Sequence, residues 1–171
     1  MWDEIAGAAA AESELWAQSL LPRAERRGEA VFSPLADERF RIGVETIYEG
    51  YLVHYGRARL FAPADAETAL LLGDYLYAHG LVRVADVGDV TAVADLADLI
   101  SLCAQLRADG ADGDGIAWAA TAALLGRGAL AEARAALRDR GDVTPLAEAS
   151  RRAAGDRAVD DALAAHALAV G

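Results

Sequence analysis

Apolar residues recur at helical spacing along most of the chain, and short groups of Gly, Asp and Pro interrupt them. No segment shows the strict alternation of apolar and polar residues that predicts a β-strand. We therefore expect an all-α protein, with residues 1–171 forming a single helical bundle. Helices are expected at about residues 3–21, 36–56, 65–86, 90–108, 115–126, 128–139, 143–153 and 156–169.

Two neighbouring helices give the clearest patterns. The helix expected at 36–56 carries one continuous apolar stripe, because its apolar residues are three or four positions apart. The helix expected at 65–86 has Asp65 as its N-cap and is apolar nearly all round, which predicts a central helix of the bundle. The stripe of the first helix consists of Val44, Ile47, Tyr48, Tyr51, Leu52 and Tyr55.

The next helix, expected at 90–108, completes an expected core of residues 36–108. The shorter helices within 115–169 would pack against that core. Asp95 and Asp98 are three positions apart on this helix and are expected on its solvated face. The residues expected to be buried are Val93, Leu96, Ala97, Ile100, Cys103 and Ala104.

The composition is that of a well-packed, acidic helical protein. Hydrophobic residues make up 54% of the chain, and alanine, the best helix former, is abundant. The formal net charge is −11 and lysine is absent. Nucleic acids and anionic membrane surfaces require a positive field on their partner, so neither is expected to bind.

Nothing in the chain predicts secretion or insertion into a membrane. No run of about 18 uncharged apolar residues is present, and a bilayer span needs such a run. The first residues, MWDEIAGAAAAESELW, carry acidic side chains where a signal peptide has basic ones. The lone Cys103 has no partner for an internal disulfide. A cytoplasmic protein is expected.

Three segments resemble the polyprenyl diphosphate synthases, the all-helical enzymes that elongate isoprenoid chains. They are ETIYEGYLVH at 45–54, ALLLGDYLYAHGL at 69–81 and, less distinctively, VADLADLISLCAQL at 93–106. Members of that family have an apolar helix that ends in Leu-Val-His or Leu-Ile-His, followed by a helix that opens with Leu-Leu-x-Gly-Asp-Tyr-Leu. The similar region runs from Gly43 to about Asp109, and the resemblance implies a shortened isoprenoid synthase fold.

The residues on which the chemistry of that family depends are missing. Its members ionise an allylic diphosphate with magnesium held by two Asp-Asp-x-x-Asp motifs, since hard cations need closely spaced carboxylates. At the position of the first motif, after His54, this chain reads Tyr-Gly-Arg-Ala-Arg. The only Asp-Asp pair, Asp160–Asp161, lacks a third aspartate at the required spacing, and the Gly-Gly-Lys-Arg motif of the family is absent. We therefore expect no catalysis by the usual route, no metal and no cofactor.

The resemblance implies a non-catalytic role. Synthases of this family work as dimers through central helices, and some pair an inactive small subunit with a catalytic one. We expect an accessory or regulatory subunit that forms a homodimer, or a heterodimer with a catalytic prenyl synthase, through an apolar face of residues 65–106. A prenyl-type ligand is a further option. Two alternatives stay open: a residual prenyltransferase-type enzyme, and a helical scaffold or adaptor unrelated to isoprenoids.

The end of the helix at 36–56 carries the main candidates for a ligand site. Arg57 and Arg59, together with His54, could bind a diphosphate, since guanidinium groups fit phosphate oxygens. The alternative is that the two arginines bind the carbonyl groups at the end of the helix that precedes them. In that case His54 is a packed, hydrogen-bonded helix residue.

Four other residues could contribute to the same site. Tyr51 and Tyr55 could line a ligand pocket or a partner surface, because tyrosine suits half-wet interfaces; the alternative is aromatic packing between core helices. Gln105 matches a glutamine of the family's pocket helix by resemblance alone. Asp74 lies within an apolar helix and needs a partner if buried. In the resembled family the matching aspartate belongs to the signature of the fold, so the resemblance implies a structural hydrogen bond. The loop DGADGDG at 109–115 lacks the ligand spacing of a calcium site and is expected to be an acidic turn.

Overall fold

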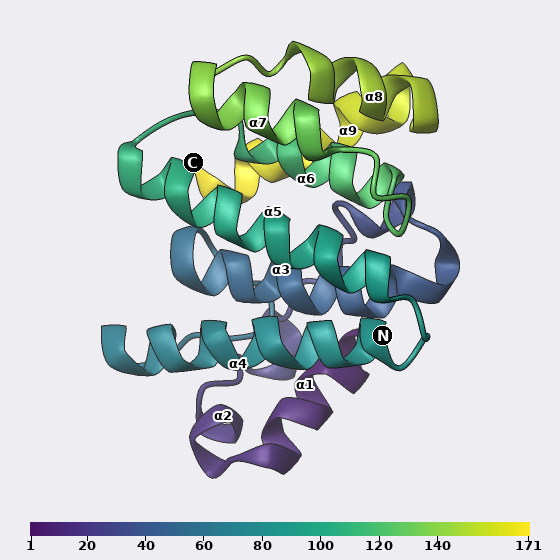
Figure 1. Cartoon of the computed structure of the whole chain (residues 1–171). Coiled ribbons are helices and arrows are strands. Elements are labelled where there is room, and N and C mark those ends of the chain that lie inside the picture. Colours follow the sequence, from purple (N-terminus) through teal and green to yellow (C-terminus); the bar gives the residue numbers. More distant parts are fainter.

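The computed structural model describes all 171 residues (Figure 1). It contains nine α-helices, and three short 3₁₀ turns lie between the second and the third of them. The expected all-helical fold is confirmed. The only extended pairing is an isolated bridge between Leu20 and Phe61. The helices are α1 Trp2–Glu12, α2 Glu14–Gln18, α3 Arg41–Tyr55, α4 Ala66–Ala85, α5 Val90–Asp109, α6 Asp114–Ala123, α7 Ala131–Arg140, α8 Thr144–Ala154 and α9 Asp156–Val170. The 3₁₀ turns are Arg23–Glu25, Ser33–Leu35 and Glu38–Phe40.

The first helix expected from the sequence, 3–21, is two helices in the structure. The chain leaves α1 at Ser13, where the backbone is extended (φ −151°, ψ 138°). The Ser13 side chain accepts a hydrogen bond from the backbone N–H of Leu15 at 3.2 Å and so acts as the N-cap of α2. Helix α3 also begins later than expected, at Arg41 rather than at residue 36, because two 3₁₀ turns occupy the segment before it.

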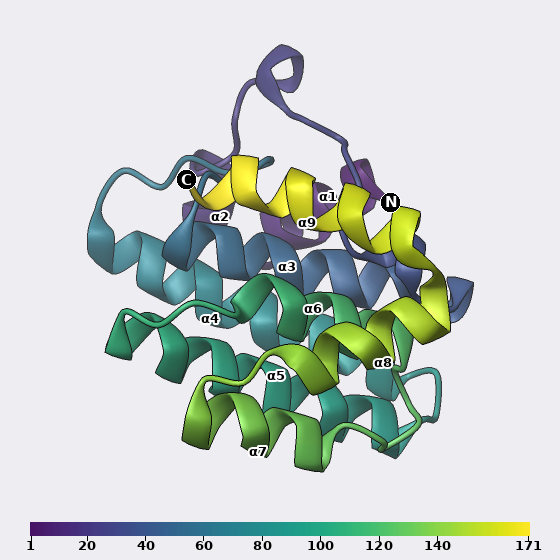
Figure 2. The same cartoon turned by 90° about the horizontal axis from the view of Figure 1, so that it is seen from above.

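Helix α3 is the central helix of the bundle. Every residue from Gly43 to Leu52 is buried, and α3 packs against both α4 and α9 (Figure 2). The sequence pattern concealed this burial because Glu45 and Glu49 resemble the polar face of an amphipathic helix. Both glutamates are fully buried, so α3 has no solvated face over these three turns.

The expectation that the helix at 65–86 is central was wrong. Helix α4 keeps one apolar side in contact with solvent, and Leu71 and Val82 on that side are 55% and 56% exposed. Figure 1 shows α4 and α5 on the near side of the molecule, with no other element in front of them. An all-round apolar helix is expected to be covered on every side, so the open side of α4 is an unusual feature of this fold.

Glycines let α3 and α4 pack closely. Gly43 lies against Gly80 and Gly50 lies against Gly73, so the two helices run antiparallel. On each helix the two glycines are seven residues apart, the spacing that keeps residues on one seam. A Cβ atom added to Gly50 would lie only 2.9 Å from the carbonyl oxygen of Gly73. The backbones therefore approach closely enough to exclude side chains from the seam.

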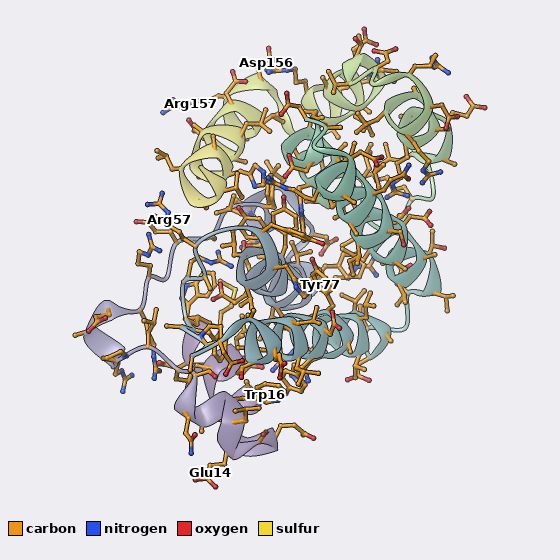
Figure 3. The ribbon with its side chains drawn as sticks, turned by 90° about the vertical axis from the view of Figure 1, so that its left-hand side faces the viewer. Glu14, Trp16, Arg57, Tyr77, Asp156 and Arg157 are labelled. Carbon is orange, nitrogen blue, oxygen red and sulfur yellow. The ribbon has the colours of Figure 1, made fainter.

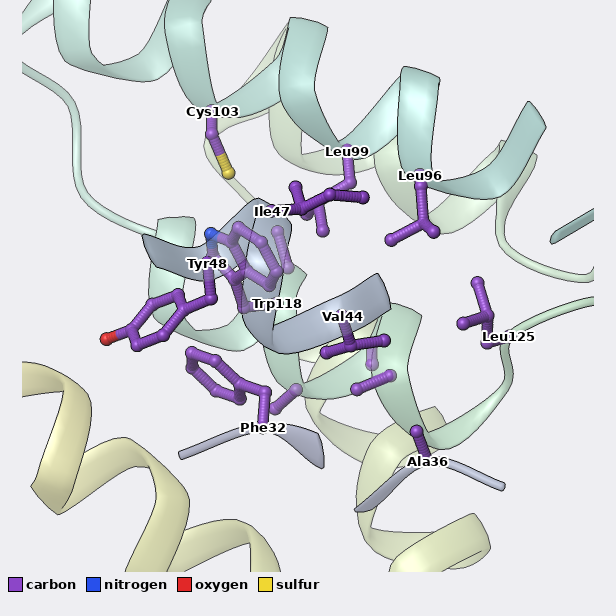
Figure 4. Close-up of a cluster of buried hydrophobic side chains, with 14 of the residues drawn as sticks. Phe32, Ala36, Val44, Ile47, Tyr48, Leu96, Leu99, Cys103, Trp118 and Leu125 are labelled. Carbon is purple, nitrogen blue, oxygen red and sulfur yellow. The ribbon is translucent and has the colours of Figure 1, made fainter. Parts of the chain in front are cut away.

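The main core joins α3, α5 and α6 around an aromatic centre (Figure 4). The ring of Trp118 stacks on Phe32 at 5.6 Å between ring centroids and meets Tyr48 edge-on at 5.1 Å. A second, smaller cluster lies between α1 and α4. Trp16 of α2, labelled in Figure 3, packs against this cluster and stacks on Tyr75 of α4 at 5.7 Å between ring centroids. The buried members of the smaller cluster are Ile5, Ala9, Leu60, Phe61, Leu72 and Leu76.

The buried face of α5 is rotated about the helix axis relative to the face expected for 90–108. Leu96 and Cys103 are buried as expected, but Ala97 and Ala104 are exposed. The larger side chains of α5 are buried in the core in place of these alanines, since their burial removes more apolar surface from water. The other apolar side chains that this face buries are Ala92, Leu99, Leu102 and Leu106.

Candidate functional site

The end of α3 and the connection that follows it form a buried ion cluster. Arg59, only 4% exposed, donates from Nε to Glu49 Oε2 at 2.9 Å and from Nη1 to Glu45 Oε2 at 2.7 Å. Backbone N–H groups satisfy the remaining carboxylate oxygens, as buried charges require. Those of Val31 and Ser33 donate to Glu45, and those of Arg59 and Leu60 donate to Glu49.

This cluster directs Arg59 into the protein interior. Burial alone would lower the pKa of Arg59, but Glu45 and Glu49 raise it above its ordinary value. The guanidinium group also lies over the rings of Trp2, at 4.6 Å, and Tyr48, at 5.0 Å. Arg59 therefore holds the connection after α3 against that helix, with its charge facing internal carboxylates.

Arg57 points in another direction, toward the C-terminal end of α9 (Figure 3). Its backbone N–H donates to the carbonyl oxygen of Ala169 at 2.8 Å, and its guanidinium group donates to that of Leu168. The arginine thus caps helix carbonyl groups. They belong to α9, however, and not to the helix that precedes Arg57 in the sequence.

A surface hollow of about 130 Å³ lies between Arg57 and α9. Its polar wall contains Arg27 and Arg57, neither of which forms an ion pair, together with the buried Arg59 and the exposed Glu29. The remaining wall is apolar and consists of Val31, Ala165, Leu168 and Ala169. A small anion with an apolar part fits the chemistry of this lining.

A second polar network lies at the other end of the aromatic centre. Tyr51 donates its hydroxyl hydrogen to Asp114, and Arg107 Nε donates to the Tyr51 oxygen at 2.8 Å. Arg107 also donates from Nη2 to Asp114 Oδ2. On the far side, His166 Nε2 lies 3.4 Å from Asp114 Oδ2, and His166 Nδ1 shares a hydrogen bond of 2.9 Å with the Tyr48 hydroxyl.

The network favours one protonation state for its members. Burial alone would raise the pKa of Asp114, but the adjacent His166, the hydrogen bond from Tyr51 and the charge of Arg107 hold it well below the ordinary value of aspartate. Burial raises the pKa values of Tyr51 and Tyr48 far above that of free tyrosine. Asp114 is therefore an anion and both tyrosines stay protonated at neutral pH.

An aspartate, a histidine and a hydroxyl group in series are also the parts of a hydrolytic relay. Tyr48, which holds the position of the nucleophile in such a series, is fully buried, and His166 is buried as well. A substrate therefore has no access to the hydroxyl group. The arrangement instead ties α9 to α3 and α6 through Tyr48, His166 and Asp114.

His54 faces α4 rather than the two arginines. Its Nε2 atom lies 3.2 Å from Asp74 Oδ1, and the imidazole is nearly buried whereas the Asp74 carboxylate is exposed. Burial lowers the pKa of His54 below its ordinary value, and the neighbouring Asp74 opposes that shift. Gly73 leaves the space that the imidazole occupies, since a Cβ atom at Gly73 would lie 2.3 Å from His54 Nε2. Asp74 thus has a partner, although this carboxylate is not buried.

The residues predicted to share one site lie in separate places. His54 meets α4, Arg57 meets α9, and Arg59 enters the core. Tyr51 belongs to the Asp114 network. Tyr55 packs on Tyr51 at 5.2 Å between ring centroids and lies 5.9 Å from the Arg107 guanidinium. Gln105 is exposed on α5.

The space between α3 and α4 contains no pocket for a prenyl-type ligand. The glycine seam closes that interface, and none of the main surface hollows is lined by a residue of α4 or α5. No group of three or more His, Cys, Asp or Glu side chains is placed to hold a metal ion. Tyr48 and Tyr51 of α3 pack against Trp118 and His166 in the core.

Asp95 is a correction to the sequence analysis. It is buried, not solvated, and its Oδ1 atom accepts a hydrogen bond from Arg134 Nη1 at 3.3 Å. Its Oδ2 atom accepts from the backbone N–H of Gly126 at 3.0 Å. Only Asp98, three residues later, is on the solvated face, where it also contacts Arg134. Asp95 therefore anchors the connection between α6 and α7 to α5.

The open sides of α4 and α5 form one apolar surface, which we call the α4–α5 surface. Half of the eight large apolar side chains that the protein exposes are on these two helices: Leu70, Leu71, Val82 and Val90. On α5 the exposed positions continue as a stripe of small residues spaced alternately by four and three. This stripe consists of Val90, Ala94, Ala97, Ser101, Ala104 and Ala108.

Comparisons with known proteins identify no relative. No family model, no curated protein and no solved structure matches this chain. None of its helices is both long enough and apolar enough to cross a lipid bilayer. The candidate sites therefore depend on their geometry alone.

Sequence reasoning missed three residues of the Asp114 network. Asp114 falls in the loop that is expected to be an acidic turn, and Arg107 and His166 belong to no motif in the sequence. Their signals are weak in the sequence because they come from three different helices. The single useful sign was His166, a polar residue within the apolar pattern of α9.

Proposed function

We propose that this protein is a non-catalytic helical subunit that acts by binding a partner protein through the α4–α5 surface. The resemblance to polyprenyl synthases suggests a catalytic prenyl synthase as that partner. The observation that supports the proposal is the exposed apolar surface on two long helices that are otherwise well packed. Exposed apolar patches of this kind are typical of protein interfaces.

Two features of the interior are consistent with a non-catalytic role. The carboxylates of α3, Glu45 and Glu49, are neutralised by Arg59 and by backbone N–H groups, so they have no role in holding magnesium. The Tyr48–His166–Asp114 series is buried and serves to join helices. None of these carboxylates, and no member of the Tyr48–His166–Asp114 series, lines a main surface hollow.

Affinity purification from the native host tests this function. The wild-type chain is expected to retain a catalytic prenyl synthase, and the double variant Ala97→Gln/Ala104→Gln is expected to lose it. Glutamine adds bulk to the stripe of α5 without adding charge and suits a helix. The matched control is Leu15→Gln, which changes an exposed apolar residue on α2 that lines none of the main hollows and should leave recovery unchanged.

Other results of that experiment assign other roles. Specific recovery of proteins unrelated to isoprenoid synthesis, with the same loss in the α5 variant, would support a helical scaffold or adaptor. Equal recovery by the wild-type chain and the α5 double variant would contradict a role for the α4–α5 surface.

A second candidate function rests on the hollow beside α9. Arg27 and Arg57 are cations without carboxylate partners at the edge of an apolar wall, which favours binding of an organic diphosphate by a residual prenyltransferase-type enzyme. A turnover assay with isopentenyl and allylic diphosphates, with and without magnesium, tests it. Turnover that Arg57→Ala abolishes would establish this alternative and overturn the non-catalytic role.

A further inference from the structure

The rim of the α4–α5 surface carries one sign of charge. Helices α4 and α5 and the turn between them expose five carboxylates and no arginine. Two of them, Asp74 and Asp98, lie beside the apolar positions themselves and are 66% and 62% exposed. Asp98 pairs with Arg134 at 3.2 Å, whereas the other four carboxylates have no arginine partner. The complete set is Glu67, Asp74, Asp86, Asp98 and Asp109.

The two arginines of these helices do not offset that charge at the surface. Arg83 turns toward α1 and pairs with Glu4 at 2.8 Å. Arg107 turns toward the interior, where it binds Tyr51 and Asp114. Most of the exposed arginines without a carboxylate partner are elsewhere, such as Arg27 and Arg57 near α9.

This distribution discriminates between possible occupants of the surface. Two copies of the chain related by a two-fold axis would place acidic rim against acidic rim, because such an interface uses the same patch on both subunits. Like charges brought together at an interface disfavour that pairing. A partner with basic residues beside its apolar stripe would instead gain from the same charges.

We propose that the occupant of the α4–α5 surface is a helical segment of a different protein, with lysine or arginine on both sides of its apolar stripe, rather than a second copy of this chain. The inference rests on the proposed function and names the chemistry of its partner. The small residues of the α5 stripe let a partner helix approach closely, since alanine and serine leave the backbone accessible. The larger Leu71 and Val82 on α4 would then contact the side of that helix.

Two labelled synthetic peptides test the charge preference. Both are helical, with the same leucine and alanine seam at heptad positions a and d; one has lysine and the other has glutamate at positions e and g. Fluorescence anisotropy with the full chain is expected to show the lysine peptide binding at least tenfold more tightly at 50 mM NaCl. The ratio should shrink at 300 mM NaCl, because salt screens exposed charges.

Charge reversal at the rim provides the decisive variant. Asp86→Lys/Asp109→Lys should weaken binding of the lysine peptide and strengthen that of the glutamate peptide. Both positions are at helix C-termini, where lysine favours the helix dipole, so folding is retained. Glu25→Lys/Asp161→Lys makes the same change in net charge away from the surface and should leave the preference as in the wild type.

The outcomes separate this inference from the proposed function. Equal binding of the two peptides, lost in Ala97→Gln/Ala104→Gln, would overturn the charge preference and leave the α4–α5 surface as a binding site. Sedimentation of the chain alone is expected to show a monomer. A dimer that the same double variant dissolves would also overturn the inference while supporting the surface. Binding of neither peptide would contradict both proposals.

Discussion

Gly50 on α3 and Gly73 on α4 lie in such close contact that a Cβ atom on Gly50 would meet the Gly73 carbonyl oxygen at 2.9 Å. The obstacle is backbone, which cannot rotate away as a side chain can. Gly50→Ala should therefore push the two helices apart and lower the free energy of unfolding by about 1–3 kcal/mol, the usual range for overpacking. Urea unfolding followed by circular dichroism measures the change.

Gly7 supplies the control for that substitution. It lies within α1, and a Cβ atom there would have no neighbour within 4 Å. Gly7→Ala should be neutral or stabilise the protein by up to about 1 kcal/mol through helix propensity. Equal losses for the two variants would show that the glycine seam does not set the distance between α3 and α4.

Arg59 is the single cation between two buried glutamates, and its removal should be severe. Arg59→Met keeps the apolar stem but leaves Glu45 and Glu49 without their counter-charge. We expect a loss of about 3–5 kcal/mol in the free energy of unfolding, as for other broken buried ion pairs. Arg152→Met, at an exposed position, should change the free energy of unfolding by no more than about 0.5 kcal/mol. A change as small as that for Arg59→Met would refute a stabilising role of the buried cluster.

Because of Asp114, the free energy of unfolding should fall as the pH is lowered into the acid range. A carboxyl group whose pKa is lower in the folded than in the unfolded state adds stability above the unfolded value, about 3.9. That contribution is lost as pH falls through the lowered folded-state pKa. Asp114→Asn should therefore be less stable than the wild type by about 1.5–3 kcal/mol at pH 7, the usual contribution of hydrogen bonds to a charged group.

The pH series for Asp114→Asn has a clear internal check. The difference from the wild type should narrow as pH falls below about 4, because the unfolded wild-type chain then binds a proton at Asp114 that the folded chain still excludes. Asp112, in the exposed turn before α6, has no hydrogen bond or ion pair to lose, so Asp112→Asn should change the free energy of unfolding at pH 7 by no more than about 0.5 kcal/mol. If the difference in unfolding free energy between Asp114→Asn and the wild type stays constant as pH falls from 7 to the lowest pH measured, the charge of Asp114 adds no stability.

His54 and Asp74 offer a measurement by NMR. Burial lowers the pKa of His54 and Asp74 opposes that shift, so Asp74→Asn should lower the pKa further. Imidazole resonances followed through a pH titration measure this directly. His79, whose pKa is lowered by burial and by Arg83, should titrate as before, and an increase in the His54 pKa would contradict the assigned pair.

Helical periodicity predicted the kind and order of elements, but not which helix lies at the centre. The stripe of α3, from Val44 to Tyr55, was visible because its members are large and regularly spaced. The burial of Glu45 and Glu49 was not, because it depends on an arginine in the following connection and on backbone groups at residues 31–33. Such partners meet only in the folded chain.

The site was predicted less well than the fold for the same reason. Neighbours in sequence, such as Arg57 and Arg59, turned to opposite sides of the connection that carries them. Groups that do converge, such as Tyr48 and His166, come from distant helices. Spacing along one helix indicates which residues share a face, but not which second helix that face will meet.

The hydrogen bond between Tyr48 and His166 joins positions 118 residues apart, which constrains the order in which this protein matures. During translation, α3 leaves the ribosome long before α9 exists. The tyrosines on its buried face therefore stay exposed or loosely packed until α9 is synthesised and docks. Contacts of such long range slow folding and prolong the exposure of apolar surface, so the nascent chain is most vulnerable to aggregation just before α9 emerges.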